Sequence, residues 1–281
     1  MSDRILIVNA DDYARTPSVS AGIRKSHLDG IVSTTTVMMN LPGALDEIRI
    51  AQSESPQLGL GVHLNLTFGP PCEPVSKVQT LLDADGLFND KTRLFTNPEM
   101  INIKEVEFEW RAQIENFLTS GSVLDHIDSH HHIALLSPDL WKLFLHLAEE
   151  YDCGVRPPNP SDVSVDTLFN TYSAEVIDFV RHGATAFLEQ SKLAYPHYFY
   201  ASFYGPAATL DHLLHLLKTI PEGISELMCH PGYTDPDLRA TSGYAHERER
   251  ELAALTHPDT IRTVEEAGLR LSTYRQAWNR S

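Results

Sequence analysis

The chain has few cysteines and no excess of basic residues. Cys72, Cys153 and Cys229 are the three cysteines among 281 residues, and no two of them form a CxxC pair. Their wide spacing argues against a disulfide scaffold and against a thiolate zinc site. Lys and Arg number 22 against 38 Asp and Glu, which gives a formal net charge of −16. Because a nucleic-acid-binding protein needs basic residues to neutralise phosphates, this balance predicts no nucleic-acid partner.

Long apolar segments and a secretory signal are also missing. The short apolar run at residues 5–8 soon meets Asp11 and Asp12, and it lacks the basic start and the small-residue cleavage site of a signal peptide. No uncharged apolar stretch approaches the roughly 20 residues needed to span a bilayer. We therefore expect a cytoplasmic protein with no membrane partner. The sequence allows a homodimer without requiring one.

Apolar runs alternate with amphipathic stretches over most of the chain. Strands are expected at residues 5–8, 32–39, 58–66, 123–128, 153–156 and 224–229, and helices at 17–29, 43–52, 104–118, from 138 onward and at 210–217. Such alternation predicts an α/β fold with parallel strands. Neither GxGxxG nor GxxxxGK[ST] follows the first strand, which weakens an open nucleotide-binding sheet. An irregular, TIM-like (β/α) barrel is therefore favoured over an open doubly wound sheet.

Two segments interrupt this alternation. Residues about 68–100 are rich in proline and charge, and residues about 157–205 open with prolines and later carry an aromatic cluster from Tyr195 to Tyr204. Loops of this length in a compact fold are commonly functional. We expect a single domain over residues 1–281, with these two segments as loop-rich insertions over the site.

Polar residues recur where the expected strands end. Because the carboxyl ends of parallel strands carry the ligand-binding loops of such folds, these residues are expected to share one site at that end. Each has an ordinary alternative taken alone: an Asp pair can form a turn, and a single His can be a core or turn residue. The candidates, from five strands, are Asp11, Asp12, His63, His130, Arg156 and His230.

The types of these residues indicate a divalent metal. Two adjacent carboxylates repel one another unless a cation or a basic group compensates them, so the Asp pair favours a metal. Three consecutive histidines, 130–132, are rarely needed for packing, and Asp128 is placed to orient an imidazole. A carboxylate with two imidazoles suits zinc, cobalt, nickel or iron and leaves positions open for water and substrate. Magnesium normally takes more oxygen ligands.

The motifs that carry these residues resemble those of the YdjC-like carbohydrate deacetylases, which include the chitooligosaccharide deacetylases. The matching segments occur in the family's order over about residues 4–275. They are IVNADDY at 7–13, GIVSTTT at 30–36, GVHLNLT at 61–67, HIDSHHH at 126–132, VR at 155–156 and MCHP at 228–231.

The resemblance implies a (β/α)-barrel-like fold and metal-dependent removal of acetyl groups from N-acetylated sugars of the chitooligosaccharide type. By the family's pattern Asp12, His63 and His130 would bind one divalent ion. The ion would be Mg²⁺ by family resemblance, or Zn²⁺ or another transition metal by ligand type. Asp11 would be the base that activates water and His230 the acid that protonates the leaving amine. Arg156 would position Asp11 or keep its carboxylate charged.

Two departures from the family pattern concern the substrate pocket. Many members have Phe-Gly where this chain has Tyr13 and Ala14, and many have a further His where this chain has Ala134. Two other functions stay open at this point. One is a metal-dependent amidohydrolase or phosphoesterase acting on a non-sugar substrate. The other is a sugar-binding barrel without catalysis.

Overall fold

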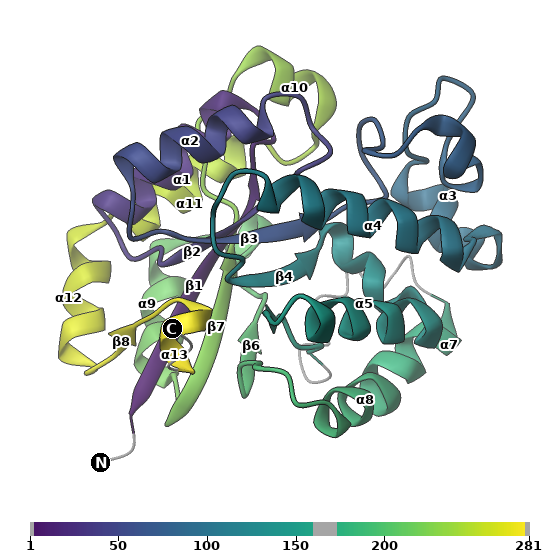
Figure 1. Ribbon diagram of the computed structural model, residues 1–281. Helices are drawn as coiled ribbons and strands as arrows, with labels where there is room; N and C mark the ends of the chain where they lie inside the picture. Colours follow the sequence, from purple (N-terminus) through teal and green to yellow (C-terminus); the bar gives the residue numbers. More distant parts are fainter. Residues whose placement is uncertain (1–2, 160–172, 279–281) are drawn as a thin grey trace.

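The structure, a computed structural model, describes residues 3–159 and 173–278 (Figure 1). Its strands form one parallel sheet in the order β5-β4-β3-β2-β1-β7-β6, with β8 beside the start of β1. The strands are β1 (Arg4–Tyr13), β2 (Thr34–Val37), β3 (Gly59–Leu64), β4 (His126–Ser129), β5 (Gly154–Val155), β6 (Tyr198–Tyr200), β7 (Gly223–Cys229) and β8 (Arg270–Leu271).

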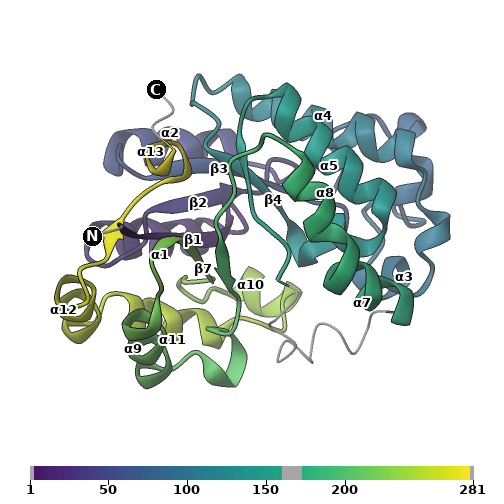
Figure 2. The same cartoon turned by 90° about the horizontal axis from the view of Figure 1, so that it is seen from below.

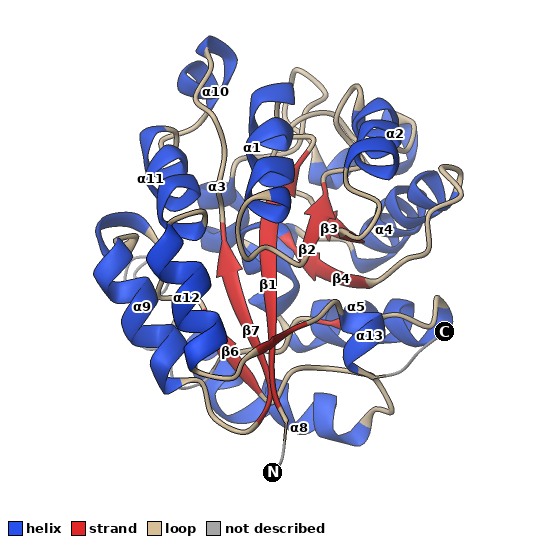
Figure 3. Cartoon of the chain, turned by 90° about the vertical axis from the view of Figure 1, so that its left-hand side faces the viewer, coloured by secondary structure: helices blue, strands red, loops and turns tan. Residues whose placement is uncertain are grey.

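Helices surround the strands on the outside, as the views from below and from the side show (Figures 2 and 3). Among the described residues, no helix is both long and apolar enough to cross a bilayer. The longer helices are α1 (Pro17–Leu28), α2 (Ala44–Glu54), α4 (Ile103–Leu118), α5 (Pro138–Glu150), α9 (Leu210–Thr219), α11 (His246–Leu255) and α12 (Pro258–Glu266). The shorter ones are α3 (Lys91–Thr96), α7 (Ala174–Asp178), α8 (Ala184–Gln190), α10 (Pro236–Thr241) and α13 (Tyr274–Ala277).

The expected parallel, barrel-like α/β fold is confirmed, with one irregularity. In the described part of the chain β5 and β6 are the two edges of the sheet, so strand pairing does not close the barrel. The gap between them is bridged instead by single hydrogen bonds. The N–H of Val155 donates to the carbonyl of Ala194 (2.9 Å), and the Asn159 side chain donates to the carbonyl of Phe199 (2.6 Å).

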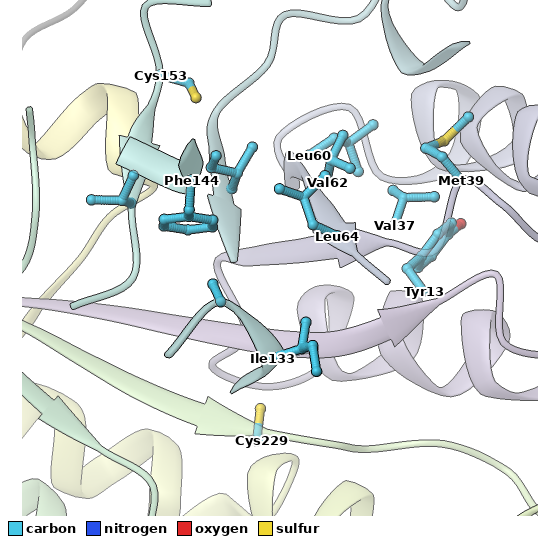
Figure 4. Packing of buried hydrophobic residues seen from close by; sticks show 14 of the residues in the cluster. Tyr13, Val37, Met39, Leu60, Val62, Leu64, Ile133, Phe144, Cys153 and Cys229 are labelled. Atoms are coloured by element: carbon cyan, nitrogen blue, oxygen red, sulfur yellow. The ribbon is translucent and has the colours of Figure 1, made fainter. Parts of the chain in front are cut away.

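Alternating side chains of β3 divide the core from the site. Leu60, Val62 and Leu64 are buried on one face of this strand, among the apolar side chains of Figure 4. Because successive side chains of a strand point to opposite faces, His63 projects to the other face. The apolar contacts on the outside of the sheet therefore fix which way the candidate ligand points.

The two expected insertions contain short helices rather than only loop. Between residues 68 and 100 lie α3 and three short 3-10 turns, Val75–Lys77, Gln79–Leu81 and Pro98–Met100. The second insertion contains α7, α8 and β6, and its residues 160–172 lie outside the described part of the chain. The helix and turns of the first insertion span at most about two helical turns each. In the second, the π-helical turn Phe179–Gly183 joins α7 to α8 and interrupts the 3.6-residue period, so neither insertion shows a clear helical pattern.

Candidate metal and catalytic site

The two adjacent carboxylates lie on a bulge at the end of β1. The partners of Asn9 and Ala10 in β2 are Thr34 and Thr35, and the register then shifts before Tyr13 pairs with Val37. The strand thus continues through the Asp pair, whereas the sequence predicted that it would end before them. A bulge re-aims side chains at a strand end. Asp12 adopts a left-handed backbone there, with φ 71°.

The other four candidate residues also lie at carboxyl ends of strands. His63 lies near the end of β3, and His130, Arg156 and His230 directly follow β4, β5 and β7. Asp11, Asp12 and the three histidines line one cavity of about 370 Å³, a volume in the range of small-molecule sites. The cavity lining does not include Arg156, which instead contacts Asp11.

Three potential metal-binding atoms converge in this cavity. Asp12 Oδ1 lies 3.3 Å from His63 Nε2 and 3.1 Å from His130 Nδ1, and the two ring nitrogens lie 3.2 Å apart. Atoms that share a metal at bonds of about 2.0–2.2 Å lie roughly 3–3.5 Å from one another at right or tetrahedral angles. The spacing of this triangle therefore fits a single divalent ion.

Hydrogen bonding around the triangle also fits a cation. Asp12 Oδ1 is buried and accepts no hydrogen bond from any described residue. Asp128 Oδ1 lies 2.6 Å from His63 Nδ1, the contact expected of a carboxylate that orients an imidazole. When Nδ1–H of a neutral His63 donates to Asp128, the lone pair of Nε2 faces Asp12. Lone pairs that face one another in a buried site are stabilised by a proton or a metal ion between them.

The electrostatics of the site favour positive charge at the same place. Burial opposes a charged imidazole, but the Asp128 and Asp12 carboxylates raise the pKa of His63 to about 10. Burial alone would raise the pKa of Asp12, yet Arg248 and His130 hold it well below its ordinary value. Burial lowers the pKa of His130. A carboxylate and an imidazole without its proton are the forms that bind metals.

A second group of possible ligand atoms comes from Asp11, His63 and Asp128. The guanidinium of Arg156 already balances the negative charge of its two carboxylates. Arg156 donates through Nη1 and Nη2 to the two oxygens of Asp11, at 2.7 and 2.6 Å. Its Nη1 also lies 2.9 Å from Asp128 Oδ2. A paired guanidinium supplies both geometry and charge to a carboxylate. We therefore assign the group around Asp12, not this one, as the candidate metal centre.

His230 projects into the cavity from the loop after β7. Its Nε2 lies 3.8 Å from Asp11 Oδ2, and its buried Nδ1 has no hydrogen-bond partner among the described residues. Burial lowers the pKa of His230 to about 4, against the opposing effect of Asp11. The imidazole is therefore neutral near pH 7 and can accept a proton. Its ring packs edge-on against Tyr204 and Tyr244.

Two buried charged residues of α11 belong to the site although the sequence analysis did not find them. Arg248 Nη2 donates to Asp12 Oδ2 at 2.5 Å, so it binds the oxygen that faces away from the histidine pair. Glu251 accepts the N–H of His230 at 2.5 Å and the hydroxyl of Tyr244. Burial raises the pKa of Glu251 to about 7. Arg248 and Glu251 are three residues apart and both buried, whereas HERERELAAL suggests a charged, solvated helix.

The insertions and neighbouring loops form the walls of the cavity. Lys91 comes from the first insertion and Tyr204 from the second, and the guanidinium of Arg15 lies 3.6 Å from the ring centre of Phe68. The Tyr204 ring stacks on that of Tyr244 at 4.3 Å. The cavity lining thus combines aromatic rings with two cationic side chains, Arg15 and Lys91.

The sequence matches one protein family over most of its length. The model of the family described as YdjC-like protein matches residues 5–266. The chain belongs to the YdjC-like family. A carbohydrate deacetylase of Enterococcus faecalis strain V583 is 34% identical over 279 residues, with 98% of each chain covered. A carbohydrate deacetylase of Geobacillus stearothermophilus is 31% identical, covering 97% of this chain and 98% of the relative.

A solved structure that is similar to this chain over nearly its whole length has the same fold. It is a crystal structure of an Enterococcus faecalis V583 protein proposed to be a cellobiose-phosphate cleavage protein. It superposes with a TM-score of 0.83, is 33% identical and covers 98% of both chains. The expected family and the expected fold are therefore confirmed.

The two departures from the family pattern have different surroundings. Ala14 is buried and has a left-handed backbone, with φ 69°, a conformation that glycine adopts without strain. Ala134 is buried, and its N–H donates to the Ser129 hydroxyl at 3.2 Å. Neither residue lines the cavity.

We predict that Ala14→Gly leaves the free energy of unfolding within about 0.5 kcal/mol of the wild type. Relief of the left-handed strain, about 1–2 kcal/mol, offsets the lost methyl burial and the added chain entropy. Ala51→Gly, at a buried helical position of α2, is the matched control and should cost about 1.5–2 kcal/mol. Urea denaturation measures both values. Equal losses in the two variants would contradict the prediction.

Proposed function

We propose that this chain is a metal-dependent carbohydrate N-deacetylase. The observation that carries the proposal is the triangle formed by Asp12 Oδ1, His63 Nε2 and His130 Nδ1, with edges of 3.1–3.3 Å. The carbohydrate deacetylases at 34% and 31% identity support a sugar substrate. We propose that one divalent ion binds at this triangle. Two imidazoles favour a transition metal such as Zn²⁺, and Mg²⁺ is the alternative from the family resemblance.

The proposed mechanism assigns a task to each neighbouring side chain. A bound ion would acidify water and polarise an acyl oxygen. Asp11 would take the proton of the attacking water through Oδ2, which accepts one hydrogen bond, from Arg156, whereas Oδ1 accepts from both Arg156 and Asn9. His230 would donate a proton to the departing amine, which is too basic to leave as an anion. Its pKa of about 4 means that it starts neutral, so it would first receive the proton that Asp11 takes from water, across the 3.8 Å between Asp11 Oδ2 and His230 Nε2.

The cavity walls suggest the substrate class. Tyr204 and Tyr244 offer ring faces to a sugar, and Arg15 and Lys91 line the same cavity. These two cations could pair with an anionic group on the sugar. A phosphorylated substrate is also suggested by the relative proposed to cleave cellobiose phosphate. Diacetylchitobiose and its phosphate are therefore the first substrates to compare, with phosphate monoesters and non-sugar amides as the tests of the rival hydrolase functions.

The first prediction is that acetate release from N-acetylated disaccharides depends on the ion. A strong chelator and, separately, His130→Ala should each lower kcat/KM by about 10³-fold, because several kcal/mol of transition-state stabilisation are lost. Adding back Zn²⁺, Mn²⁺ or Mg²⁺ should restore only the chelated wild type. His146→Ala, an exposed histidine of α5, is the matched control. Full activity in chelator or in His130→Ala would overturn the proposal. Sugar binding without acetate release would favour the non-catalytic alternative.

The second prediction concerns Arg248. We expect Arg248→Met to weaken binding of Zn²⁺ or Mn²⁺ by about tenfold or more, because Asp12 loses the partner that orients its carboxylate. Competition with a chromogenic chelator measures this affinity. Arg262→Met removes an arginine that is paired with Asp259 on the surface and should leave the affinity unchanged. Equal or tighter metal binding in Arg248→Met would show that Arg248 does not support the ligand.

A further inference from the structure

A buried glutamate holds the third nitrogen of Arg156. Two nitrogens of this guanidinium bind Asp11, and the third, Nε, donates to Glu226 Oε1 at 2.8 Å. Glu226 lies in the middle of β7 and is fully buried. Since the three nitrogens of a guanidinium lie in one plane, a bond at Nε fixes the angle at which the other two meet their partner.

The glutamate is held in turn by the C-terminal segment. The hydroxyl of Tyr274, the first residue of α13, donates to Glu226 Oε2 at 2.6 Å. Tyr274 is buried, and burial raises its pKa well above the ordinary value, so the hydroxyl keeps its proton. The chain of bonds therefore runs from Tyr274 through Glu226 and Arg156 to Asp11.

Tyr274 is itself fixed from several sides. Its N–H donates to Asp125 Oδ2 at 3.1 Å, and its ring stacks on His126 with centres 4.1 Å apart. Gly154 leaves room for the ring, since a Cβ at that position would lie 2.5 Å from Tyr274 Cδ1. A capping box between Thr273, which precedes Tyr274, and Gln276 begins the helix that contains Tyr274.

This segment lies at the other end of the barrel from the cavity. β8 precedes it and pairs with Ile5 and Leu6, at the start of β1, whereas Asp11 and Asp12 are at the end of that strand. Figure 1 shows β8 and α13 beside the first half of β1. Tyr274 is not part of the cavity lining.

We propose that Glu226 and Tyr274 are positioning residues that act on Asp11 through Arg156, so that the C-terminal segment controls the geometry of the base. The proposal rests on the proposed function for its kinetic consequence. Without the Tyr274 hydroxyl, Glu226 loses a partner, Nε is held less firmly, and the guanidinium can tilt against Asp11. A tilted base lowers the rate of the chemical step but leaves sugar binding in the cavity intact.

The first arm of the test does not depend on activity. The Nε–H resonance of Arg156 is followed by NMR in protein labelled at arginine, and it is assigned by its loss in Arg156→Lys. In Tyr274→Phe this resonance should move by more than its line width and exchange with solvent about fivefold faster. Tyr151→Phe, which removes a hydroxyl that donates to Glu115, is the matched control and should leave it unchanged. An unmoved Arg156 resonance in Tyr274→Phe overturns the proposal.

The second arm measures acetate release. Tyr274→Phe should lower kcat about fivefold with KM unchanged, and should have no further effect in an Arg156→Lys background. Thr260→Val, a buried hydroxyl deletion in α12, controls for lost stability alone. An equal loss in both backgrounds overturns the proposal. If the wild type releases no acetate, the proposed function fails, and the resonance shift still decides whether Tyr274 positions Arg156.

Discussion

Three atoms with lone pairs meet in a buried cavity: Asp12 Oδ1, His63 Nε2 and His130 Nδ1. Much of the surrounding structure offsets the repulsion between them. Each atom alone would be solvated or hydrogen-bonded, but together they leave the Asp12 oxygen without a donor among the described residues. Such an arrangement persists only if strong neighbouring interactions impose it. The bulge of β1 and the left-handed backbone of Asp12 are the backbone part of this cost. A divalent ion at this point would turn the repulsion into attraction.

Charged side chains around the triangle divide the work of holding it. Asp128 orients His63, Arg248 binds the second oxygen of Asp12, and Arg156 binds both oxygens of Asp11. All of these groups are buried, so removal of one partner would leave an uncompensated charge at a cost of about 3–5 kcal/mol. The paired charges come from separate strands and from α11. The site therefore forms only when the sheet and α11 are folded together.

Sequence patterns were sufficient to predict the parallel sheet and the residues that meet in the cavity. His63 could be placed because its strand alternates strictly, and His130 and His230 because they end apolar runs. The bulge at Asp11 and Asp12 depends on the register with β2, which no local pattern encodes. Arg248 lies in a helix whose many charges predict exposure, and the partner of Glu226 is a tyrosine 48 residues away. Such pairings depend on tertiary contacts, which local periodicity does not reveal.

The central claim is that one ion binds Asp12, His63 and His130 together. The most direct measurement is an anomalous difference map from crystals of the protein soaked in Mn²⁺ or Zn²⁺. The account predicts one strong peak per chain, about 2.0–2.3 Å from Asp12 Oδ1 and from both ring nitrogens. A map without a peak there, or with the ion bound between Asp11 and Asp128 instead, would contradict it.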